Sequence, residues 1–87
     1  MNNKVIVKVI VPEIFQTYDV FLPINKKIGN IVLLLNKAIN EMSENHFSIS
    51  NCNVLYNAKT KKEYRSDVLL LNTDIRNGTE LVLINLT

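Results

Sequence analysis

Apolar and polar residues alternate in the first part of the chain. From Lys4 to Val11 every second residue is a valine. This period of two, carried by β-branched side chains, predicts a strand with its valines buried and with Ile6 and Ile10 on the opposite face. Thr17–Leu22 alternates in the same way and predicts a second strand. Between the two, Pro12–Gln16 has the length of a hairpin loop.

The pattern then changes to steps of three and four residues, which is the spacing of one helix face. The expected apolar face carries Ile28, Ile31, Leu35, Ala38, Ile39 and Met42. Pro23 marks the end of the preceding strand, and Asn25 is placed to cap the first free amides. We therefore expect one main helix over about residues 26–43. Because one amphipathic helix cannot bury its own apolar face, the strands must form one sheet that covers it, which is an α+β fold.

Two further apolar runs predict strands after the helix. Val54–Tyr56 is short, and we expect Leu55 to face outward while its two neighbours face the helix. Thr79–Asn85 alternates again. Its leucines are expected to face inward, and Val82 and Ile84 outward.

The connecting segments are more polar and predict little regular structure. Ser43–Asn53 is irregular, with Phe47 and Ile49 as expected packing anchors. Glu63–Arg65 is expected to be a very short strand. Asp67–Leu71 is expected to form a helical turn or a tight loop that buries one of its leucines. We find no internal repeat and no linker, so residues 1–87 are expected to form a single domain.

This order of elements resembles that of ubiquitin-like proteins. Leu22-Pro23 precedes the helix, and the strand Val54–Tyr56 is followed by a turn containing lysine. Near the end, Leu71, Ile75, Gly78 and Leu81 stand at the spacing of the closing pattern of that family. The resemblance covers nearly the whole chain. It implies a ubiquitin-like β-grasp, a mixed sheet of four to five strands packed on the main helix.

The end of the chain departs from the pattern of ubiquitin and of the sulfur carriers. Those proteins end in Gly-Gly, whereas the only glycines here are Gly29 and Gly78. A role as a modifier or sulfur carrier is therefore not expected. Among members without this tail, the chain resembles the small YukD-like (EsaB-type) proteins of bacterial type VII secretion systems. That resemblance implies a cytoplasmic accessory or regulatory protein whose partners are membrane-anchored secretion components.

Composition adds limits to this interpretation. The chain has 87 residues, of which 47% are hydrophobic and 21% charged, and its formal net charge is +2. These values are ordinary for a soluble domain. Cys52 is the only cysteine, so no internal disulfide can form, which favours the reducing cytoplasm. No apolar run approaches the ~20 residues of a membrane span, so we expect no membrane insertion, and a monomer or weak homodimer.

The sequence offers no catalytic set. His46 is the only histidine, and with Cys52 it provides two candidate ligands where zinc takes three or four. No glycine-rich phosphate loop is present. We therefore expect no enzyme activity, no metal or cofactor, and no small-molecule substrate.

One basic cluster has two interpretations. It comprises Lys59, Lys61, Lys62 and Arg65. The cluster is either a solvated hairpin turn or an electrostatic contact for an acidic protein, anionic lipid or RNA. The small net charge argues against nucleic acid as the partner.

Outward apolar side chains are the stronger indication of function. In a β-grasp the first and last strands are neighbours and the third lies beside the last. The expected protein-binding face therefore comprises Ile6, Ile10, Leu55, Val82 and Ile84. Lys4 and Lys8 would rim it. Exposed apolar patches of this kind often mark interaction surfaces. In the hairpin loop, Ile14 and Phe15 either fold back on the core or form an exposed contact point.

Overall fold

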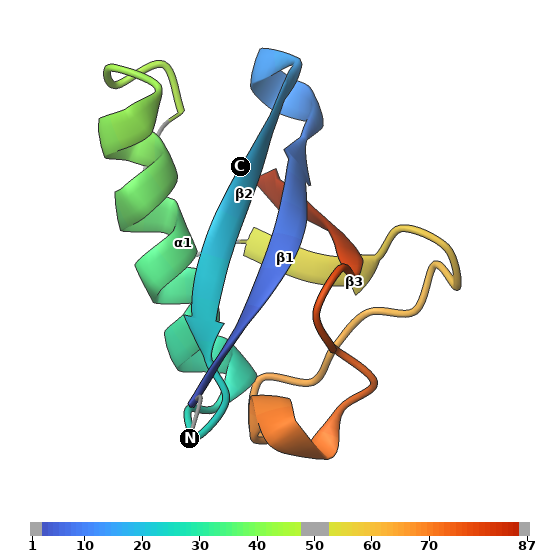
Figure 1. Ribbon diagram of the computed structural model, residues 1–87. Helices are drawn as coiled ribbons and strands as arrows, with labels where there is room; N and C mark the ends of the chain where they lie inside the picture. Colours follow the sequence, from blue (N-terminus) through green and yellow to red (C-terminus); the bar gives the residue numbers. More distant parts are fainter. Residues whose placement is uncertain (1–2, 48–52, 86–87) are drawn as a thin grey trace.

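The computed structural model describes residues 3–47 and 53–85. Its elements are β1 (Lys4–Val11), the 3-10 turn η1 (Pro12–Ile14), β2 (Gln16–Pro23), α1 (Ile28–Met42), β3 (Asn53–Asn57), the 3-10 turn η2 (Leu70–Asn72) and β4 (Glu80–Asn85). The strands form one four-stranded sheet in the order β2-β1-β4-β3. Helix α1 lies across one face of this sheet (Figure 1). The predicted α+β arrangement is confirmed.

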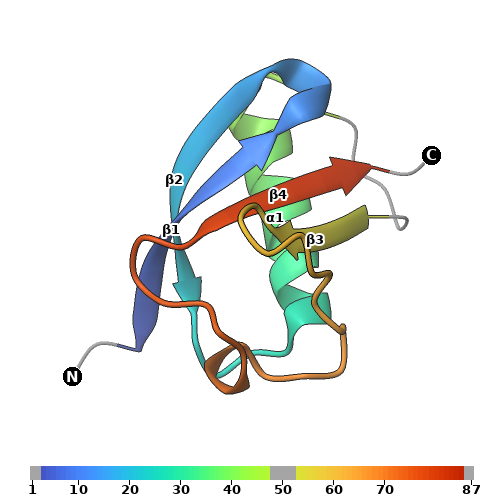
Figure 2. The same ribbon diagram turned by 90° about the vertical axis from the view of Figure 1, so that its right-hand side faces the viewer.

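The sheet is mixed because its central pair is parallel. β1 runs parallel to β4, with Lys8 opposite Glu80 and Ile10 opposite Val82. The outer strands are antiparallel to this pair: β2 pairs with β1, and β3 pairs with β4. The first and last strands therefore lie side by side at the centre of the sheet, as the resemblance implied (Figure 2).

The core lies between α1 and the inner face of the sheet. As predicted, the valines of β1 face inward, and Val7, Val9 and Val11 are buried. The core residues from the rest of the chain are Leu22, Ile28, Ile31, Leu35, Ile39, Phe47, Leu55, Leu70, Ile75, Leu81 and Leu83. Each fully buried side chain of this size contributes about 1.5–3 kcal/mol relative to exposure. The alternation of β1 and β4 is therefore what orients the sheet on the helix.

The helix is shorter than predicted, and the expected cap at Asn25 is wrong. α1 begins at Ile28, and its N-cap residue makes no side-chain cap bond. Instead, the Ile28 amide donates to the carbonyl of Val68, and the Gly29 amide to that of Ser66, both at 2.9 Å. Gly29 permits this close approach, since a Cβ there would lie 3.2 Å from the Ser66 oxygen. The helix start is thus capped by a segment distant in sequence.

The predicted orientation of β3 is also wrong. Leu55 is 1% exposed and belongs to the core. It pairs with Leu83, which faces the helix, and directly opposite residues of an antiparallel pair share a face. Val54 and Tyr56 therefore lie on the other side, opposite Ile84 and Val82.

The anchors in the connecting segments are partly confirmed. Phe47 is buried as predicted. Ile49 and Cys52 lie outside the described residues. In the second connection Leu70 is buried whereas Leu71 is 48% exposed. Leu70 is therefore the buried leucine expected in that turn.

Candidate protein-binding face

The face of the sheet turned away from α1 carries a row of apolar side chains. Figure 2 views the molecule from this side, with the sheet in front of the helix. Ile10 of β1 lies beside Val82 of β4, and Val82 lies beside Tyr56 of β3. Val82 is only 7% exposed although it faces away from the helix. With the neighbouring pair Ile84 and Val54, these five residues form what we call the open-face cluster.

A polar row borders this cluster on the same face. The Nζ of Lys8 lies 3.2 Å from Oδ1 of Asp19 on β2, and Lys8 stands opposite Glu80 on β4. Beyond that row lie Ile6 and Phe21, which pair across β1 and β2 and are 38% and 62% exposed. The polar row therefore separates two apolar areas that would otherwise be continuous.

A turn of lysines stands at the edge of the open-face cluster. It follows β3 and projects on the side of the sheet away from α1 (Figure 1). The Oδ1 of Asn57 accepts hydrogen bonds from the amides of Lys59, at 2.8 Å, and Thr60, at 3.1 Å. Lys61 adopts a left-handed conformation with φ 64°. The turn is thus tightly held, and it presents exposed lysines beside an apolar surface.

Comparison with protein-family models and with curated proteins finds no match. Solved structures do match. The ubiquitin-like domain of the Mycobacterium tuberculosis type VII secretion system protein EccD1 superposes with a TM-score of 0.75 at 14% identity. The match covers 98% of this chain and 100% of that one. The fold is ubiquitin-like.

The same ubiquitin-like fold occurs in other assemblies. A chain of a toluene 4-monooxygenase complex matches with a TM-score of 0.73 at 6% identity, over 94% of this chain and 98% of that one. A chain of the ESX-5 inner membrane complex matches with a TM-score of 0.68 at 18% identity. That match covers 94% of this chain but only 21% of the other. At such identities the likeness concerns the fold alone.

On this ubiquitin-like fold, the predicted face is only partly assembled. The structure brings Ile10, Val82 and Ile84 together, and places Ile6 across the polar row. Leu55 does not take part, because it is in the core. The sequence prediction missed Val54, Tyr56 and Phe21. For the two β3 residues, the missing information was the register of β3 on β4.

The four residues of the basic cluster divide into two groups. The three lysines belong to the turn after β3, whereas Arg65 lies further along the chain and pairs with Asp67 at 3.0 Å. Both side chains of this pair are largely exposed, so the pair contributes little to stability. The predicted strand at Glu63–Arg65 reduces to one bridge between Glu63 and Tyr56.

Tyr64 connects the turn after β3 to the segment that precedes β4. Its hydroxyl donates to Oδ1 of Asp74 at 2.6 Å and accepts from Nδ2 of Asn57 at 3.1 Å. Burial, followed by the hydrogen bond to Asp74, raises the pKa of Tyr64 to about 12. A phenol with such a pKa stays protonated at neutral pH. Its role is to position the turn that Asn57 organises.

The hairpin tip combines both alternatives that the sequence left open. Ile14 packs against the core. Phe15 is 92% exposed and adopts a left-handed conformation with φ 54°. One residue of the pair therefore closes the end of the core, and the other projects into solvent.

The described residues contain no group of three or more side chains that could hold a metal ion. His46 is exposed, and its Nδ1 lies 2.6 Å from the carbonyl of Ser43 within the loop. Among residues 3–47 and 53–85, no helix is long and apolar enough to cross a membrane.

Proposed function

We propose that this chain is a non-enzymatic protein-interaction module that acts as an accessory or regulatory component of a bacterial type VII secretion system. It binds a protein partner through the open-face cluster, with Ile6 as a neighbouring contact. Residues 1–87 act as a single ubiquitin-like domain. The observation that carries the proposal is the apolar row of Ile10, Val82 and Tyr56 beside the lysine turn.

The chemistry of this surface indicates what the partner presents. An apolar area at the centre with charges at its edge is the usual arrangement of a protein interface. The lysine turn supplies positive charge on one border. The partner is therefore expected to insert an apolar side chain against Val82 and to place acidic residues opposite Lys59 and Lys62. Such rim charges mainly accelerate association.

Likeness in fold to the EccD1 domain supports the secretion assignment. The match to a chain of the ESX-5 inner membrane complex points in the same direction. On this proposal the chain works in the cytoplasm, and its partners are membrane-anchored secretion components.

The test compares two apolar sites outside the core. Ile84→Asp places a charge in the open-face cluster, whereas Leu34→Asp does so on α1, where Leu34 is 50% exposed. Tagged wild type and both variants are used to capture partners from detergent-solubilised membranes of the source bacterium. Mass spectrometry should find type VII components with wild type and Leu34→Asp, and at least tenfold less with Ile84→Asp. Equal capture by all three proteins would show that the open-face cluster is not part of the interface.

The rival function is binding of nucleic acid or an acidic surface through Lys59, Lys61, Lys62 and Arg65. It is favoured by the exposure of the lysines on one tight turn, although Arg65 is engaged by Asp67. Fluorescence anisotropy with a labelled single-stranded RNA separates the two. The proposal expects no binding at 150 mM salt. Tight binding that weakens steeply as salt rises, as phosphate contacts require, would establish the rival.

A further inference from the structure

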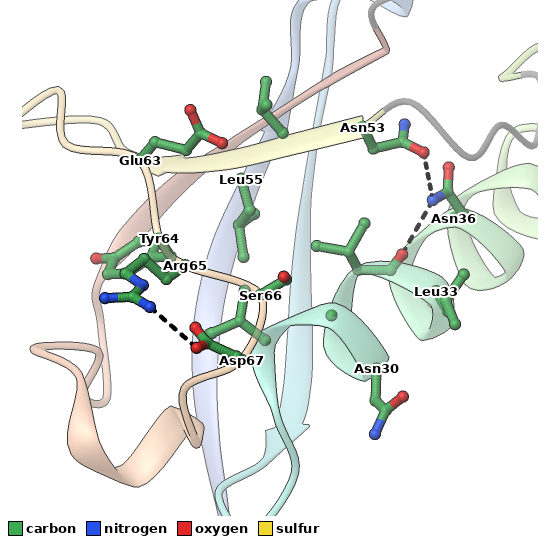
Figure 3. A pocket seen from close by; sticks show the side chains of 14 residues that line it. Asn30, Leu33, Asn36, Asn53, Leu55, Glu63, Tyr64, Arg65, Ser66 and Asp67 are labelled. Atoms are coloured by element: carbon green, nitrogen blue, oxygen red, sulfur yellow. Dashed lines mark hydrogen bonds and ion pairs between the residues drawn. The ribbon is translucent and has the colours of Figure 1, made fainter.

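A groove lies at the outer edge of the sheet, between β3 and α1, and Val54 of the open-face cluster is among its lining residues. Its walls are the first half of α1, the outer edge of β3 and residues 63–67 (Figure 3). Its volume of about 1140 Å³ exceeds the roughly 300–1,000 Å³ of typical small-molecule pockets. The groove is open along one side, so it suits an extended occupant better than a compact one.

One wall of this groove is a strand edge that is only partly paired. The Tyr64 amide donates to the carbonyl of Leu55, and the Asn57 amide donates to that of Lys62, both at 3.0 Å. Leu55 and Asn57 therefore direct their backbone groups away from β4. By the alternation of an antiparallel ladder, Asn53 does the same. Within the described residues no strand lies beside the Asn53–Leu55 part of this edge, because the pairing stops at Tyr64.

Two buried amides meet where this edge begins (Figure 3). Nδ2 of Asn36 donates to the Val32 carbonyl at 3.1 Å and to Oδ1 of Asn53 at 2.7 Å. Oδ1 of Asn36 and Nδ2 of Asn53 are buried, and neither atom has a hydrogen-bond partner among residues 3–47 and 53–85. Asn36 is 1% exposed, and an apolar residue at this place in α1 would avoid the cost of the unpaired oxygen. One free acceptor and one free donor are complementary to a peptide group, which carries both.

We propose that this groove binds an extended segment of another protein, which adds to the free edge of β3 and continues the short ladder begun by Tyr64. A peptide group of the segment donates to Oδ1 of Asn36 and accepts from Nδ2 of Asn53. Strand addition of this kind takes its affinity from main-chain hydrogen bonds. An apolar side chain of the segment packs against Leu33, which is 58% exposed at the groove.

The charges at the groove favour polypeptide over nucleic acid. Among the described residues that line the groove, Arg65 is the only basic one, and Asp67 already pairs with it. Glu63 adds a further exposed carboxylate. The groove therefore has no positive charge to offer a phosphate backbone, and a basic side chain of the segment fits beside Glu63.

The experiment uses the full chain and a phage-displayed library of random twelve-residue peptides. Enriched peptides are synthesised and titrated into isotope-labelled protein. The amides of Leu55, Tyr64 and Ser66 and the side-chain amide of Asn36 should shift. Asn36→Leu should weaken the best peptide by roughly tenfold or more, since a buried hydrogen bond is lost. Because this substitution also removes the donor to Oδ1 of Asn53, the melting temperature of the variant is measured beside its affinity.

A matched pair keeps the test decisive if Asn36→Leu fails to fold. Leu33→Glu alters the groove, whereas Leu34→Glu changes the adjacent exposed residue, which does not line it. Only Leu33→Glu should weaken the peptide. The proposal is overturned if no peptide is enriched, if shifts fall on Val82 and Ile84, or if both leucine variants bind like wild type. Shifts on Val82 and Ile84 would place the peptide on the open-face cluster instead, whereas the other two results do not bear on that cluster, so the two surfaces can fail separately.

Discussion

The two faces of the sheet carry similar apolar residues in different states. On the side of α1, Val9, Leu81 and Leu83 are completely buried. On the open side the apolar side chains range from Val82, at 7% exposed, to Phe21, at 62%. The difference follows from what covers each face. A helix seals the first, whereas on the second the residues cover only one another.

The open face also differs in being interrupted. Lys8, Asp19 and Glu80 cross it as a polar row, and among the described strand residues no such row crosses the face under the helix. Large continuous apolar areas on a small protein promote association with any similar surface. A divided face keeps each apolar area small while leaving the open-face cluster available to a partner. The polar row thus favours selective binding of one partner over the burial of the largest possible apolar area.

The largest expected effect separates the two sides of β3. Leu55→Ala should lower the free energy of unfolding by about 2–5 kcal/mol, because it leaves a cavity in the core. Val54→Ala, one residue earlier on the open side, should cost about 1 kcal/mol or less. Urea denaturation measures both. Similar losses of stability in the two variants would contradict the assignment of Leu55 to the core and of Val54 to the open face.

A smaller effect is expected from the residue that holds β3 in place. Tyr64→Phe loses the hydrogen bonds to Asp74 and Asn57 and should lower the free energy of unfolding by about 1 kcal/mol at neutral pH. The pKa of Tyr64 is raised from 10.0 to about 12, so the unfolded chain loses this proton first. Wild-type stability should therefore fall between those pH values relative to the variant. A constant difference between the two proteins across that range would contradict this account.

The smallest effect on stability is expected at the polar row. Lys8→Leu breaks an exposed ion pair with Asp19, so the free energy of unfolding should change by less than about 1 kcal/mol. It also joins the two apolar areas of the open face. Sedimentation velocity should therefore show self-association that grows with concentration, and the control Lys37→Leu on α1 should remain as wild type. Absence of self-association would show that the row does not limit contact between copies.

Much of the fold follows from local patterns in the sequence. Valine at every second position of β1 and leucine at alternate positions of β4 orient both strands correctly, because each pattern is long enough to define a phase. Val54–Tyr56 has three apolar residues in succession, so its phase depends on pairing with β4. The sequence placed the cap of α1 at Asn25, but the first amides of the helix donate to the carbonyls of Ser66 and Val68. Because these two residues are distant in sequence, no local pattern could show this.

The candidate sites depend even more than the fold on contacts between residues that are distant in sequence. Ile10, Val82 and Ile84 could be placed on one face because period two applies along each strand. The groove could not be foreseen, because its walls come from three separate segments of the chain. The unpaired atoms of Asn36 and Asn53 depend on a contact across 17 residues. Local sequence carries no sign that these two amides meet.

The parallel pairing of β1 with β4 has a consequence for folding. β1, β2 and α1 follow one another along the chain, so their contacts close short loops, whereas the hydrogen bond from Ile6 to Asn77 spans 71 residues. Long loops cost more entropy to close, and distant contacts slow folding. During synthesis the hairpin and helix emerge while one edge of β1 is still unpaired. Closure of the sheet by β4, rather than helix formation, is the step before which the nascent chain is open to aggregation or to capture by a chaperone.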